Sequence, residues 1–203
     1  SSDLTCYGKD TNFEVLLNGN DINSITTSEL TQDINTIDLK WDEDATLYDF
    51  SSMFKDCDNI LEVDFSIRYF NVKDLNFEYM FSNCNSLSSV NIFDINLEAP
   101  DQNLNLNYMF SNCRVLASIN IFNIQIKPNT GKGYLYMNNM FSNCTSLSTL
   151  NISNIQISAI NNGYLYMNFM FSGGLSLSTA NFSNIYVIAN KKGYIYMNNT
   201  FKD

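Results

Sequence analysis

A motif repeated at a nearly constant interval is the feature that most constrains how this chain of 203 residues can fold. The motif Phe-Ser-Asn-Cys occurs three times, with looser copies before and after it. The copies begin at Phe54, Phe81, Phe110, Phe141, Phe171 and Phe201, which gives a period of about 30 residues. A unit of this length cannot bury its apolar side alone, whereas stacked units share one continuous core. The repeat therefore predicts a solenoid, each coil of which is called a rung below.

Apolar residues keep step with the repeated phenylalanine, and their alternation predicts short strands. Val90 and Ile92 alternate with polar neighbours after Phe81, as do Leu135 and Met137 just before Phe141. Patterns of period two are typical of strands, and stacked rungs place such strands about 4.8 Å apart in a parallel sheet. We expect a repeat solenoid, specifically a leucine-rich-repeat-type parallel β-solenoid. It should have about 30 residues per rung, short helical or irregular turns, and a right-handed coil by the crossover rule.

The repeat also divides the chain into a cap and a solenoid. Residues 1–27 lie outside the register and contain one alternating segment, 13–17, so we expect an N-terminal cap there. The solenoid is expected over 28–203, with a degenerate first rung at 28–53, five repeats at 54–200 and a truncated sixth from 201. The degenerate rung depends on the spacing of Ile34, Ile37 and Leu39.

Four copies of the repeat carry a cysteine three residues after the phenylalanine, and both columns are expected in the core. The core ladder comprises Phe54, Phe81, Phe110, Phe141 and Phe171, with Cys57, Cys84, Cys113 and Cys144. The cysteine spacing is the repeat period and not that of a metal site, so buried thiols are expected. A disulfide between adjacent rungs stays open. Cys6 lies outside the column and could bond to a partner.

The repeat unit resembles that of a known family. The pattern Met-Phe-x-x-Cys-x-x-Leu-x-x-Val-x-Ile, which runs from Met80 to Ile92, resembles the leucine-rich repeat of the BspA-like surface proteins. The resemblance covers roughly residues 47–203 and implies an extracellular or cell-surface protein, commonly used in adhesion or surface architecture, without enzymatic activity. The rungs are longer than the usual family unit, and the copy at Phe171 lacks the cysteine.

Composition argues against several functional classes. The chain has no histidine, which removes the commonest general base and the commonest metal ligand. A net charge of −10 argues against nucleic acid as a partner. No apolar run approaches the ~20 residues that a membrane span needs. We therefore expect no enzyme, no catalytic residues, no cofactor, no metal site and no membrane insertion.

The charge is unevenly distributed along the chain. Residues 1–80 carry 17 acidic and 5 basic side chains (−12), and residues 81–203 carry 4 and 6 (+2). A solvated acidic surface explains this distribution, and so do two ends that attract each other. A start at Ser1 without methionine fits a mature secreted protein or a trimmed one.

The last repeat shows no recognisable cap, so an apolar rung with an open strand edge is expected there. The candidate assembly end is Lys191, Lys192, Phe201 and Lys202. Head-to-tail stacking would then make an open filament of identical subunits. The sequence thus predicts a structural subunit of a surface filament. A natural chain that continues beyond residue 203 is the competing interpretation.

Six tyrosines are expected to form two neighbouring columns on the surface: Tyr134, Tyr164 and Tyr194, and Tyr136, Tyr166 and Tyr196. Stacked rings suit a glycan or a host or matrix protein, which makes a cell-surface adhesin the alternative function. Tyrosine also simply suits strands. Asparagine columns beside them are expected to bond along the stack. Four sequons are candidate N-glycosylation sites, at Asn143, Asn151, Asn181 and Asn198.

Overall fold

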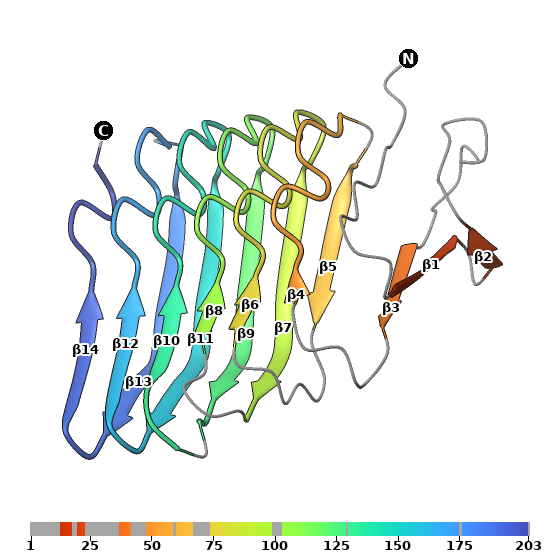
Figure 1. The fold of residues 1–203 in the computed structure, drawn as a ribbon. Coiled ribbons are helices and arrows are strands. Elements are labelled where there is room, and N and C mark those ends of the chain that lie inside the picture. Colours follow the sequence, from red (N-terminus) through yellow and green to blue (C-terminus); the bar gives the residue numbers. More distant parts are fainter. Residues whose placement is uncertain are drawn as a thin grey trace.

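The computed structural model of the chain describes residues 13–17, 20–22, 37–41, 48–58, 60–66, 74–98, 103–128, 130–174 and 176–202. Two parallel sheets face each other and are joined by arcs at both ends (Figure 1). The chain alternates between the two sheets, so that each rung adds one strand to each of them. The predicted parallel β-solenoid, with one repeat per rung, is confirmed.

The first sheet has five strands, in the spatial order β13-β11-β9-β7-β5. They are β5 (Glu62–Ser66), β7 (Ser89–Leu97), β9 (Ser118–Ile126), β11 (Thr149–Ala159) and β13 (Thr179–Ala189). The second sheet has six strands, in the order β14-β12-β10-β8-β6-β4. They are β4 (Tyr48–Asp49), β6 (Asp74–Asn76), β8 (Asn103–Asn105), β10 (Gly133–Tyr136), β12 (Asn162–Tyr166) and β14 (Lys192–Tyr196). Equivalent residues of successive repeats pair in register, as Ile121 does with Ile152.

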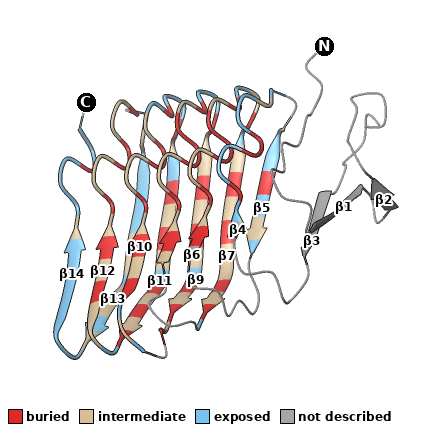
Figure 2. Cartoon of the chain, in the orientation of Figure 1, coloured by how far each residue is buried: buried red, intermediate tan, exposed pale blue. Residues whose placement is uncertain are grey.

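The core lies between the two sheets, where the inward side of the strands from β6 to β12 is buried (Figure 2). In β10 the pattern is simple: Leu135 is fully buried, and Tyr134 and Tyr136 face outward at intermediate exposure. Met137 is also fully buried. The inward and outward directions expected for this segment are therefore confirmed.

The longer strands contain a break in the alternation that the sequence pattern did not reveal. In β9, Ile121 and Ile124 are both fully buried although they are three residues apart. Between them lies Asn123 with a φ of 56°, and Asp94, Asn154 and Asn184 hold the equivalent left-handed position in other strands. Asparagine and aspartate tolerate this conformation better than other non-glycine residues. The residue realigns the chain so that both halves of the strand face the core.

The predicted phenylalanine column is present. Ring centroids are 5.2 Å apart between Phe54 and Phe81, 5.3 Å between Phe81 and Phe110, 5.5 Å between Phe110 and Phe141, and 5.7 Å between Phe141 and Phe171. The segment around each ring is a pair of tight turns, and the described residues contain no helix. Main-chain bonds alternate between the turn and the next rung: Met80 N–H donates to Phe77, and Phe81 N–H donates to Met109. Of the two expected forms, the irregular turn is the one observed.

A third sheet, β2-β1-β3, is antiparallel and separate from the solenoid sheets. It consists of β1 (Phe13–Leu17), β2 (Asn20–Ile22) and β3 (Ile37–Trp41). The alternating segment expected within the cap is thus a strand. Within the expected degenerate rung, 28–53, β4 pairs with β6 in the solenoid, whereas β3 pairs with β1 in the antiparallel sheet. In this register apolar residue types lie opposite each other, such as Val15 and Leu39. Ile34 and Cys6 lie outside the described residues.

Candidate interaction surfaces

The six predicted tyrosines form one continuous stack, called the tyrosine face below, on the outer side of β10, β12 and β14. Ring centroids along the columns are 5.0 Å apart for Tyr134–Tyr164, 5.6 Å for Tyr164–Tyr194, 5.1 Å for Tyr136–Tyr166 and 4.9 Å for Tyr166–Tyr196. Neighbours within a rung also stack, with 5.7 Å between Tyr134 and Tyr136 at an interplanar angle of 4°. Both predicted columns are therefore present and touch each other.

This stacking decides which part of each ring solvent can reach. A ring covered on both sides by parallel neighbours presents its edge and its hydroxyl, and hides its π faces. Burial and the neighbouring hydroxyls of Tyr196, Tyr134 and Tyr164 raise the pKa of Tyr166. Tyr194 is 41% exposed because it lies in the last rung of the stack. Ligands that bind by lying flat on a ring consequently meet a bare face at that end, and edges elsewhere.

The C-terminal rung, made of β13, β14 and residues 197–202, exposes residues that belong to the core columns. Leu135 and Leu165 are fully buried, whereas Ile195 in the same column is 43% exposed. Met137 and Met167 are likewise buried, but Met197 is 44% exposed, and Phe201 is 49% exposed. Pale blue covers β14 in Figure 2, in contrast to the red and tan strands beside it. Among the described residues no segment covers this rung.

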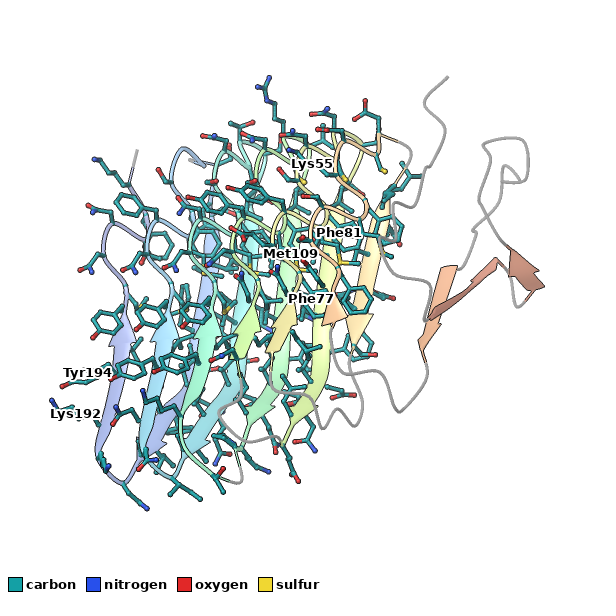
Figure 3. The ribbon with its side chains drawn as sticks, in the orientation of Figure 1. Lys55, Phe77, Phe81, Met109, Lys192 and Tyr194 are labelled. Carbon is teal, nitrogen blue, oxygen red and sulfur yellow. The ribbon has the colours of Figure 1, made fainter. Side chains whose placement is uncertain are left out.

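Charge differs between this rung and the N-terminal rung, which consists of residues 48–58 and 60–66. Lys191, Lys192 and Lys202 are exposed in the C-terminal rung, which contains no acidic residue between 176 and 202. The N-terminal rung exposes Asp49, Asp56, Asp58, Glu62 and Asp64, with Lys55 as its cation. Figure 3 shows Lys192 and Tyr194 at the β14 end of the molecule. The expected difference in charge between the ends is therefore present in these two rungs.

The cysteine column is a structural feature of the core. Cys84, Cys113 and Cys144 are fully buried free thiols, and Cys57 is half-buried. Each buried thiol donates to a main-chain oxygen of an earlier rung, for example Cys113 to Phe81 at 3.2 Å. Burial raises the pKa of Cys113 and of Cys144 to about 12 and raises that of Cys84 further. Buried thiols are confirmed for these three residues, and no disulfide joins the four cysteines of the column.

Asparagine ladders run along the solenoid, as expected. Asn168 donates its side-chain N–H to Asn138 Oδ1 at 2.9 Å, and Asn181 donates to Asn151 at 2.7 Å. The ladders also include three of the candidate glycosylation sites, because the Nδ2 atoms of Asn143, Asn151 and Asn181 are the donors. A glycan on these atoms would compete with the ladder bonds. Asn198 is exposed in the C-terminal rung.

The sequence prediction missed the aspartates at the start of these ladders. Asp64 accepts from Asn91 at 2.7 Å, and Asp56 accepts from Asn83 at 2.6 Å. The signal was present in the repeat alignment, because aspartate stands in the first copy where asparagine stands in later ones. Within the described ranges, no group of histidine, cysteine, aspartate or glutamate side chains is arranged to hold a metal ion. No helix in that part of the chain is long and apolar enough to span a bilayer.

Comparison with known proteins gives no relative: no family model, no curated protein and no solved structure matches the chain. The resemblance to the BspA-like surface proteins therefore stays a prediction from the repeat unit.

Proposed function

We propose that the protein is a non-enzymatic structural protein of the cell exterior, and that it joins a larger assembly through the C-terminal rung. The observation that carries the proposal is the exposure of core-column residues at this rung. Ile195, Met197 and Phe201 are each more than 40% exposed, while their counterparts one rung earlier are at most 2% exposed. A further rung stacked on β13 and β14 would bury these side chains and satisfy the open edges of both sheets.

Sedimentation of the native material tests the proposal. We expect the protein to sediment within an assembly larger than one chain, and the Ile195→Lys variant to be released from it. Lysine at this position places an ammonium group in the apolar surface that a further rung must cover. Tyr186→Lys is the matched control, because Tyr186 is on the same rung, is 54% exposed and faces outward from β13. The proposal is wrong if native material sediments as a single chain and both variants behave alike.

Two forms of this assembly are distinguishable with the purified chain. The form predicted from the sequence is a filament of identical copies stacked head to tail, favoured by the acidic N-terminal rung and the basic C-terminal rung. A second form joins the C-terminal rung to a different chain. Fibres in micrographs of the purified chain alone would support the first form. Their absence, with assembly present in native material, would support the second.

Adhesion through the tyrosine face is the second candidate function. The observation that favours it is the stack of six outward-facing tyrosine rings, whose centroids within each column are 4.9 to 5.6 Å apart. Binding to a glycan array or to matrix protein should then be lost when Tyr136, Tyr166 and Tyr196 are replaced by serine. Binding that survives this change, or no binding to any ligand, would contradict it.

A further inference from the structure

Side-chain ladders of the solenoid begin in aspartate on the N-terminal side. Five such contacts are present: Asn76 donates to Asp49 at 3.0 Å, Asn83 to Asp56 at 2.6 Å, Asn85 to Asp58 at 2.9 Å, Asn91 to Asp64 at 2.7 Å and Asn123 to Asp94 at 3.1 Å. In each of them the later rung donates to the earlier one. Aspartate recurs at this place in columns from both sheets and from the arcs between them.

The aspartates give the ladders a fixed direction. An ionised carboxylate only accepts hydrogen bonds, whereas an asparagine amide both donates and accepts. The asparagine above an aspartate must therefore turn its NH₂ toward the carboxylate and its oxygen toward the next rung. The same orientation continues to the other end, where Asn181 donates to Asn151 at 2.7 Å and Asn184 donates to Asn154 at 2.9 Å.

The C-terminal rung consequently presents acceptors in its ladder positions. Asn181 and Asn184 use their N–H groups on the rung below, so their Oδ1 atoms are on the side that a further rung would cover. Tyr186 reaches Asn184 Oδ1 from its own rung at 3.4 Å, which is a long contact. Any rung that stacks here must therefore bring donors to these two positions.

The N-terminal rung of a second copy does not meet this requirement. Its residue in the column of Asn181 is Asp64, which would bring a carboxylate against an amide oxygen. The overall charge difference favours approach of the two ends, but this local contact opposes their docking.

We propose, given the assembly role proposed above, that the C-terminal rung accepts a repeat unit with asparagine in both ladder positions. This occupant is a parallel β-rung of the same repeat type, with amide donors opposite Asn181 and Asn184 and apolar residues opposite Ile195, Met197 and Phe201. The acidic N-terminal rung of an identical copy is excluded. The aspartates thus set the direction of the ladders and oppose head-to-tail growth of identical chains.

An added rung provides the test. The full chain is extended after Asp203 by a second copy of residues 174–203, which carries asparagine in both ladder positions. Two variants carry Asn181→Asp or Asn184→Asp in the added copy only. The matched control carries Ser183→Asp in the added copy, which introduces the same charge on the outer side of the same strand but outside the two ladders. Urea unfolding followed by circular dichroism gives the stability of each protein.

The unmodified extension should raise the unfolding midpoint above that of the original chain. Each ladder substitution should raise the unfolding equilibrium constant of the extended chain by about a factor of ten, because it replaces a hydrogen bond with two facing acceptors. The control should raise it by less than about threefold, since a surface change away from a ladder costs little. Equal losses of stability in ladder and control variants would overturn the inference alone. No gain from the unmodified extension would overturn the proposed assembly role as well.

Discussion

Replacing Phe110 by alanine should destabilise the solenoid more than the same change at either of two other phenylalanines. The Phe110 side chain is fully buried, and its ring lies between those of Phe81 at 5.3 Å and Phe141 at 5.5 Å. Phenylalanine-to-alanine changes in cores cost about 3–5 kcal/mol. The main-chain bonds between rungs hold the neighbouring rings apart, so the cavity cannot collapse. We therefore expect a loss of about 4–5 kcal/mol.

The same change at Phe201 and at Phe122 should cost less stability than at Phe110. Phe201 is 49% exposed, stacks on the ring of Phe171 at 5.3 Å and meets that of Phe182 edge to face at 5.9 Å. About half of its burial is missing, so the Phe201→Ala change should cost about 1–2 kcal/mol. Phe122 faces outward and stacks on Phe93 at 5.6 Å, so the Phe122→Ala change should cost about 1 kcal/mol.

The assay is equilibrium unfolding in urea, followed by far-ultraviolet circular dichroism. Fluorescence of the single tryptophan is unsuitable, because Trp41 belongs to β3 in the separate antiparallel sheet. The expected order of losses is Phe110→Ala, then Phe201→Ala, then Phe122→Ala. A Phe110→Ala variant that loses no more stability than Phe122→Ala would refute the reasoning, since an outward-facing ring and a ring inside the buried column would then be equivalent.

Three further predictions concern the thiols, pH and the left-handed asparagines. In the native protein near neutral pH, iodoacetamide should modify Cys57 but leave Cys84, Cys113 and Cys144 intact in peptide mass spectra; rapid modification of the buried three would contradict their burial. Because the pKa of Cys113 and Cys144 rises from 9.0 to about 12 on folding, the unfolded chain loses these protons first, and stability should fall between about pH 9 and 12. The slope is up to about 1.4 kcal/mol per pH unit for each thiol, and it should be smaller in a Cys113→Ala variant. Asn112 has a φ of 61° and accepts a hydrogen bond from Asn143, a bond that both Asn112→Ala and Asn112→Gly remove. Because alanine disfavours the left-handed conformation and glycine does not, Asn112→Ala should cost about 1–2 kcal/mol more in urea unfolding. Equal losses would show that the left-handed conformation carries no strain.

Columns that recur in the sequence were predictable, because the repeat itself aligns them. The phenylalanine and cysteine columns, both tyrosine columns and the inward direction of Leu135 all follow from a nearly constant repeat length and a period-two alternation. Their placement needs no long-range information beyond the stacking of equal units.

Features that depend on a single residue's conformation or on a competing partner were not predictable from the pattern. The left-handed position of Asn123 lets Ile121 and Ile124 share the core, and a period-two reading does not reveal it. β3 has the spacing of a rung, yet it pairs with β1 in a separate antiparallel sheet, and the spacing alone does not name its partner. The ladder direction depends on which residue of a column is aspartate, and the alternation of apolar and polar residues does not distinguish aspartate from asparagine.

The central claim is that each repeat forms one rung, so that equivalent side chains stack along a common axis. The most direct measurement is of nuclear Overhauser contacts between the ring protons of phenylalanines in a selectively labelled sample. The account predicts contacts between Phe81 and Phe110, between Phe110 and Phe141, and between Phe141 and Phe171, whose ring centroids lie 5.3, 5.5 and 5.7 Å apart. Absence of these contacts, with cross-peaks that link each ring to unrelated positions of the repeat, would contradict it.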